Sequence, residues 1–180
     1  MTETDENINS LLQTVEQFYK DISLLLQSAD SLVQKHGLKP TDNKAFQILS
    51  TLNAPAQWQP SVFFRYYVYE RKRNWLPFIS VISGNPENGV RLARPLASAG
   101  WYEFEKKTDY FYDFAAAHLW AKGALDDGTP ATMQPSIEWK NYHRDATKAT
   151  SLAVPLVTTK NTQDLESKIV YPLIKLMESN

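Results

Sequence analysis

Residues 8–37 read INSLLQTVEQFYKDISLLLQSADSLVQKHG, and this stretch decides the fold. Its apolar side chains recur in alternating steps of three and four residues, which places them on one side of an α-helix. The pattern predicts a long amphipathic helix over residues 5–36 that ends at Gly37 and Pro40. In heptad notation the apolar rows are Ile8, Val15, Ile22 and Ala29 at a, Leu11, Phe18, Leu25 and Leu32 at d, and Leu12, Tyr19, Leu26 and Val33 at e.

This apolar seam has two interpretations. A parallel coiled coil suits β-branched a positions and Leu-rich d positions, but it normally carries charged pairs at e and g. Here the e row is apolar, and the g row reads Asn7, Thr14, Asp21, Ser28 and Lys35. A wide a/d/e stripe is typical of a helix laid on a sheet or in a bundle. We therefore expect the whole seam to pack within its own chain, with a homodimer through residues 8–33 as the alternative.

The segment 61–106 predicts an antiparallel meander. Four stretches rich in β-branched and aromatic residues are separated by turn residues, and they read SVFFRYYVYER, LPFISVIS, GVRLARPL and GWYEFEK. Pro77 and Pro95 each remove a backbone donor, so we expect them at strand ends, edges or bulges. A short helix is predicted before the meander, at residues 42–52.

The remaining sequence predicts a helix at 109–122, then strands and a closing helix within 137–178. Asn161 or Thr162 is suited to cap the closing helix, and Pro172 should kink or break it. The fold class is therefore α+β: one domain over residues 1–180, with an antiparallel meander sheet packed against long N-terminal and C-terminal helices.

The amino-acid composition excludes several kinds of functional site. The chain has 180 residues, a formal net charge of −1 and no cysteine, which excludes disulfides, thiolate catalysis and zinc–thiolate sites. The acidic, polar start MTETDENINS does not resemble a secretory signal, and no apolar run is long enough to cross a bilayer. We expect a cytoplasmic protein with no membrane partner.

The strand at 61–71 carries alternating rings and guanidinium groups. Arg65, Tyr67 and Arg71 share one side under the strand's period of two, and such a face can stack on bases and contact phosphates. With a net charge near zero, nucleic acid is not the favoured partner, because backbone binding needs a concentrated positive field. The favoured interpretation is that these amphipathic side chains cover a helix or a sheet edge.

Arg94 is the most unusual residue of the predicted meander. Strict alternation places it in an apolar row with Leu92 and Leu96, where it would need Glu70 or a bound anion as its partner. Alternatively, a bulge at Pro95 turns Arg94 outward. Both alternatives stay open. The candidate ligand-binding residues are Arg65, Tyr67, Arg71, Arg91, Arg94 and Trp101.

No common phosphate-binding, zinc-protease or serine-hydrolase motif occurs in the chain. The leading hypothesis is a non-catalytic regulatory, ligand-sensing or protein-interaction module with an aromatic and basic sheet face. Its partner would be a small-molecule ligand or a protein, and no cofactor is predicted. A second alternative is an oligomeric scaffold built on the N-terminal helix.

The enzyme alternative is a metal-dependent nuclease or other nucleic-acid-processing enzyme. Glu138 and Lys140 form an acid-x-Lys pair, and Asp126 or Asp127 could supply the upstream acid that helps to hold Mg²⁺. The signal is not specific, because acid-x-Lys also occurs at Asp42, Glu105 and Glu166. The sequence therefore does not decide whether the chain is an enzyme.

Overall fold

The computed structural model describes residues 3–41, 62–84, 91–105, 127–133 and 146–180. The helices predicted at 42–52 and 109–122 lie outside these residues. The elements are α1 (Glu3–Gln34), β1 (Leu38–Pro40), β2 (Val62–Tyr69), β3 (Trp75–Gly84), β4 (Arg91–Phe104), β5 (Ala131–Met133), β6 (Ala146–Pro155), the 3₁₀ turn η2 (Leu156–Thr158), α4 (Thr162–Leu165), the π-helical turn η3 (Glu166–Val170) and α5 (Tyr171–Glu178).

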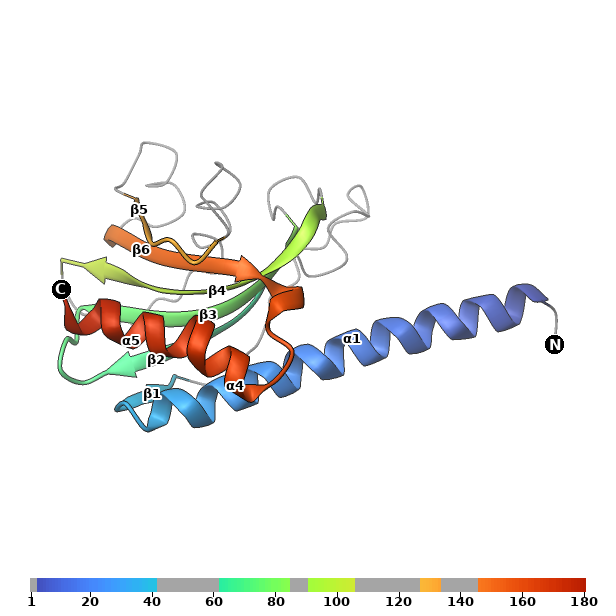
Figure 1. Ribbon diagram of the computed structural model, residues 1–180, viewed down its shortest axis with the longest axis horizontal. Helices are drawn as coiled ribbons and strands as arrows, with labels where there is room; N and C mark the ends of the chain where they lie inside the picture. Colours follow the sequence, from blue (N-terminus) through green and yellow to red (C-terminus); the bar gives the residue numbers. More distant parts are fainter. Residues whose placement is uncertain (1–2, 42–61, 85–90, 106–126, 134–145) are drawn as a thin grey trace.

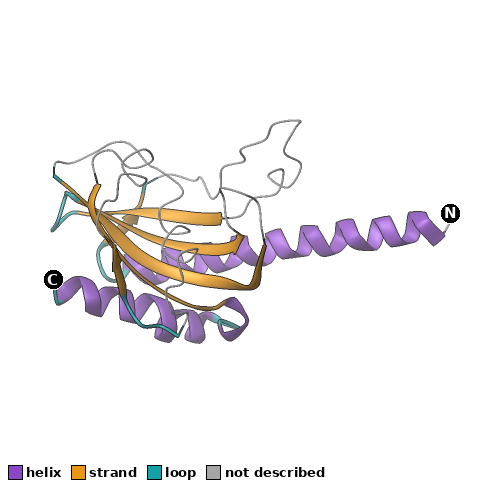
Figure 2. Cartoon of the chain, turned by 90° about the horizontal axis from the view of Figure 1, so that it is seen from above, coloured by secondary structure: helices purple, strands orange, loops and turns teal. Residues whose placement is uncertain are grey.

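One antiparallel sheet organises the chain. Its six strands follow the order β1-β2-β3-β4-β6-β5, so the strands from β1 to β4 are a meander. Helix α1 and the C-terminal helical segment lie together on one face of this sheet (Figures 1 and 2). The predicted α+β class, with helices from both ends of the chain against an antiparallel sheet, is confirmed.

Strand β4 differs from its prediction. The two strands expected at 89–96 and 100–106 are one continuous strand of 14 residues. The register between β3 and β4 shifts between the pairs Ile82–Leu96 and Gly84–Arg91, so the extra residues of β4 around Pro95 form the irregularity expected there. Arg94 lies in this irregular segment and is exposed, as the outward alternative predicts.

Both faces of the sheet are buried. The helix-covered face carries Phe63, Tyr67, Ile79, Trp101 and Leu152, which pack with side chains of α1 and of the C-terminal segment. The opposite face carries a second apolar cluster that includes Val62, Phe64, Tyr66, Phe78, Tyr102 and Phe104. The aromatic residues of the meander are thus divided between two buried layers.

The closing helix begins where the sequence predicts, and its hydrogen bonding changes just before Pro172. The Asn161 side chain accepts a hydrogen bond from the Asp164 backbone N–H at 2.9 Å, which identifies Asn161 as the N-cap. Before Pro172 the helix widens into the π-helical turn η3, where the Tyr171 N–H bonds to the Glu166 carbonyl. This turn adjusts the helix around a proline that cannot donate a backbone hydrogen bond.

The seam of α1 is sheltered over only half of its length. Ile22, Leu26, Ala29 and Val33 are at most 4% exposed against the sheet and the C-terminal helices. Toward the N-terminus, Ile8, Leu11 and Leu12 are 52%, 64% and 60% exposed. The expectation that the whole seam packs within its own chain is therefore wrong for the first half, because α1 extends beyond the sheet (Figure 1).

A substitution at Gly100 tests how closely β4 and β6 approach each other. A Cβ at this position would lie 2.1 Å from the Thr150 carbonyl oxygen and 2.7 Å from the Ser151 Cα, both backbone atoms. We expect Gly100→Ala to lower the free energy of unfolding by roughly 2 kcal/mol or more, because the two strands must separate. Ser98→Ala, on the same side of β4, removes the 3.0 Å contact between the Ser98 and Ser151 hydroxyls and should cost about 1 kcal/mol. Equal urea midpoints for the two variants would contradict the close approach.

Candidate functional site

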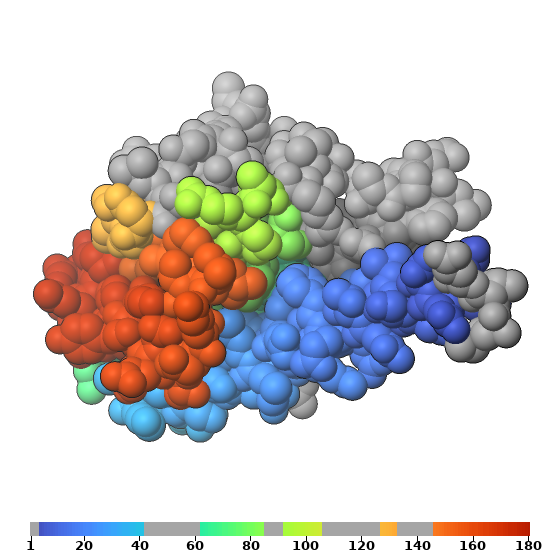
Figure 3. Space-filling view, turned by 45° about the vertical axis from the view of Figure 1, so that its right-hand side comes forward, coloured from blue at the N-terminus to red at the C-terminus, as the bar shows by residue number. Residues whose placement is uncertain are grey.

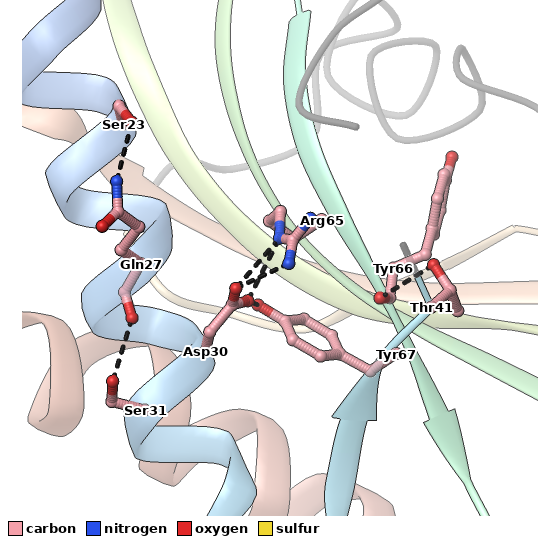
Figure 4. Close-up of polar contacts among 8 residues, drawn as sticks. All are labelled: Ser23, Gln27, Asp30, Ser31, Thr41, Arg65, Tyr66 and Tyr67. Carbon is pink, nitrogen blue, oxygen red and sulfur yellow. Dashed lines mark hydrogen bonds and ion pairs between the residues drawn. The ribbon is translucent and has the colours of Figure 1, made fainter. Parts of the chain in front are cut away.

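A buried polar cluster fixes α1 to the sheet. The Arg65 guanidinium on β2 contacts the Asp30 carboxylate on α1 through Nη2 at 2.6 Å and through Nε at 3.2 Å. The Tyr67 hydroxyl donates to the same carboxylate at 3.0 Å (Figure 4). The Arg65 and Asp30 side chains are only 9% and 17% exposed. Asp30 therefore receives hydrogen bonds from two residues of one strand.

This cluster accounts for two of the predicted ligand-binding residues. Burial raises the pKa of Tyr67 far above its usual value, and the negative charge of Asp30 raises it further, so the phenol stays protonated and donates. The side of β2 that carries Arg65 and Tyr67 faces α1. The interpretation that these side chains cover a helix is therefore confirmed for Arg65 and Tyr67, but their polar ends bond to Asp30 and are buried, where an amphipathic cover would leave them in water. Whether they also bind a ligand stays a prediction.

The other ligand-binding candidates are dispersed. Trp101 is fully buried, stacks on Trp75 with ring centroids 4.8 Å apart, and donates its indole N–H to Glu103 at 3.1 Å. Arg71 is exposed beyond the end of β2, and Arg94 is exposed in the irregular part of β4. Arg91 begins β4, opposite Gly84. The candidates therefore lie partly in the core and partly on the surface.

The nuclease candidates are only partly described. Asp127 is exposed, and its carboxylate accepts the Thr129 backbone N–H at 2.9 Å, an interaction with Thr129 that lowers the pKa of Asp127. Asp126, Glu138 and Lys140 lie outside the described residues. Within the described ranges, no group of three or more acidic or histidine side chains is placed to hold a metal ion. The acid-x-Lys site stays a prediction.

The most distinctive surface lies on the free half of α1. We call its apolar side chains the exposed seam; they are Ile8, Leu11, Leu12, Val15, Phe18 and Tyr19. Val15 is half-buried, while Phe18 and Tyr19 are each 36% exposed. They belong to an unbroken helix of 32 residues, and Figure 3 shows its N-terminal part projecting past the described body of the chain. The exposed seam is thus an ordered apolar ridge.

Phe63 on β2 marks the point where the seam changes from exposed to sheltered. The Phe18 and Tyr19 rings lie 6.1 and 5.8 Å from the Phe63 ring. Phe18 meets it edge-on, an arrangement favoured between aromatic rings. One side of each of these two rings therefore contacts the sheet, and the rest remains available to another surface.

A groove of about 520 Å³ lies between α1 and residues 156–165. Its walls are mainly apolar and include Ile22, Leu25 and Leu165. At its edge, the buried Thr159 hydroxyl has no hydrogen-bond partner among the described residues. Phe18 of the exposed seam also lines the groove, so the two features meet at this residue, whereas Leu24 lines the groove from the opposite side of α1.

Comparisons with known proteins assign no family to this chain. No protein-family model, no curated protein and no solved structure matches it. Among the helices that the structure describes, none has the length and apolar character needed to cross a membrane. The function of this chain is therefore inferred from its own geometry.

Removing Asp30 tests the cluster. In Asp30→Ala the Arg65 guanidinium stays buried without its carboxylate, so we expect the free energy of unfolding to fall by about 3–5 kcal/mol. Glu16→Ala is the matched control, because Glu16 pairs with Lys20 at 2.8 Å while both side chains are more than 60% exposed. That control should change stability by about 0.5 kcal/mol or less. Similar urea unfolding curves for the two variants would contradict an anchoring role.

The raised pKa of Tyr67 also makes the free energy of unfolding depend on pH. Its folded-state pKa is raised, whereas the unfolded side chain ionises near pH 10, so the stabilisation is complete below about pH 10 and is lost as the pH rises further. The free energy of unfolding of the wild-type chain should therefore decrease more steeply above about pH 10 than that of Tyr67→Phe. Urea denaturation between pH 8 and pH 11 measures the difference, and parallel curves would contradict it.

Proposed function

We propose that this chain is a non-catalytic protein-interaction module that binds a partner helix along the exposed seam of α1. The observation that carries the proposal is the regular heptad row of Ile8, Leu11, Leu12, Val15, Phe18 and Tyr19 on an ordered helix, with exposures up to 64%. Contiguous apolar patches of this kind mark interaction sites, whereas single exposed apolar residues do not.

A helix is the partner that fits this surface. The seam is straight, and its side chains repeat every three or four residues, so a second helix can insert its own apolar row between them. Each exposed Leu or Ile leaves on the order of 100 Å² in water, and burying that area contributes about 2–3 kcal/mol. Several such residues together offset much of the entropy lost on association.

The positions of the other candidate residues also favour a protein-interaction module. Arg65 and Tyr67 are already engaged by Asp30, and Trp101 lies in the core, so the aromatic and basic strand offers less to a ligand than the exposed seam offers to a protein. We further propose a reducing compartment such as the cytoplasm, because the chain has no cysteine.

Replacing Leu11 and Leu12 with Gln tests the proposal. Both residues are at least 60% exposed, and Gln is a good helix former, so the fold should persist with a Tm within a few degrees of the wild type. We expect the wild-type chain to sediment as a complex, either purified or in extracts of its source cells, and the double variant to sediment as the free chain.

Leu24→Gln is the matched control for this experiment. Leu24 is also 60% exposed on α1, but it faces away from the seam, so this variant should sediment like the wild type. Loss of the complex in the control as well, or the same mass for the double variant and the wild type, would contradict binding through the exposed seam.

A further inference from the structure

We propose that the partner is a second copy of this chain, with the two α1 helices antiparallel. In this dimer Ile8 packs against the partner's Phe18, and Leu11 packs against the partner's Val15. The inference rests on the proposed function, because it uses the same exposed seam and names what covers it. It restricts the interface to the free half of α1.

The placement of the folded body excludes a parallel pair. The apolar side chains of the seam face the same side of α1 along its whole length. The sheet that covers Ile22, Ala29 and Val33 therefore lies on the side to which exposed Ile8 and Leu11 point. In a parallel pair both bodies would have to occupy the space between the two helices. In an antiparallel pair the bodies lie at opposite ends, and the start of each helix lies beside the partner's sheet.

The heptad gives the register. In antiparallel packing an a residue of one helix faces a d residue of the other. Facing Ile8 to the partner's Phe18 also faces Leu11 to the partner's Val15, because both pairs of numbers sum to 26. Two-fold symmetry repeats the two pairs, so the interface has four apolar layers. Residue 3 of one helix then lies level with residue 23 of the other, close to where the partner's seam becomes buried.

The flanking rows agree with this orientation. In an antiparallel pair the two e rows face each other and so do the two g rows, whereas in a parallel pair e faces g. Leu12 at e therefore meets the partner's Leu12, and Thr14 at g meets the partner's Thr14. A parallel pair would instead set the apolar e row against the polar g row, which leaves Leu12 beside the partner's Asn7. The apolar e row is unusual in a parallel coiled coil, but in the antiparallel pair it adds apolar contacts between the two helices.

Charge also favours the antiparallel pair. The helix starts with Glu3, Asp5 and Glu6, and its first basic residue is Lys20. A parallel pair would bring six carboxylates together at one end. In the antiparallel register the two Asp5 residues lie about 24 Å apart along the axis, well beyond the Debye length of about 8 Å.

Spin labels on a chain without cysteine test the orientation directly. Gln13→Cys and Gln27→Cys introduce labels at two exposed positions that share one heptad row. The antiparallel register places position 13 level with its counterpart, whereas position 27 is displaced from its counterpart by about 42 Å along the axis. We expect a short distance between subunits for the first variant and a distance above about 40 Å for the second. Equal short distances would overturn the inference in favour of a parallel pair.

Complementary charges test the register. Leu11→Glu and Val15→Lys should each form dimers at least tenfold more weakly than the wild type, because each places charges against the partner's apolar side chains. When the two variants are mixed, Glu at position 11 faces the partner's Lys at 15 and the other Leu11–Val15 layer is intact, so heterodimers should form. Circular dichroism confirms that each variant is folded. Sedimentation that shows no heterodimer would overturn the register.

The oligomeric state separates this inference from the proposed function. Four apolar layers are a small interface, so we expect a dissociation constant in the micromolar range and a sedimentation coefficient that rises with concentration. A purified wild-type chain that stays monomeric at about 100 μM overturns the homodimer. If its source cells nevertheless contain a complex that Leu11→Gln and Leu12→Gln abolish, the interaction module stands with a different helix as its partner. If they contain none, both proposals fail.

Discussion

The buried contact between Asp30 and Arg65 decides how α1 lies on the sheet. A charge at this depth is stable only with its counter-ion, so the helix cannot slide along the sheet without exposing the guanidinium to an apolar layer. The contact lies in the second half of α1. Since α1 is one continuous helix of 32 residues, fixing its second half also fixes where the first half projects. The exposed seam is a consequence of this anchor.

Local sequence patterns predicted α1, β2, β3 and the closing helix, but not the short strands β1 and β5. The heptad of α1, the alternation in β2 and the cap at Asn161 are set by neighbouring residues, and the structure agrees with them. Strand β4 was wrongly divided because Gly100 and Pro95 are usual strand breakers. Gly100 instead allows β6 to approach closely, and Pro95 lies in a register shift. Both reasons depend on a neighbouring strand, which a single sequence does not identify.

The site was harder to predict for a similar reason. The sequence placed Arg65 and Tyr67 on one side of a strand, but their acid lies 35 residues before Arg65 on a helix, and periodicity does not pair distant residues. Periodicity also shows which side of α1 is apolar without showing what covers it. Length carries a usable signal: a helix of 32 residues is about 48 Å long, whereas β2, the strand that anchors it, has eight residues and spans about 26 Å. A strand of this length leaves part of such a helix uncovered.

The boundary between the two halves of the seam joins the fold to the interaction surface. Phe18 and Tyr19 contact Phe63, which lies on β2 two residues before Arg65 and on the same side of the strand. The rings of Phe18 and Tyr19 belong to the exposed seam and contact Phe63, a ring of the core. A partner helix that packs on Phe18 therefore also affects the packing of Phe63, which lies next to the Asp30–Arg65 contact that orients α1. One half of the apolar row thus packs in the core, and the other half is exposed on the same helix. The exposed half is rigid because the fold holds the buried half in place.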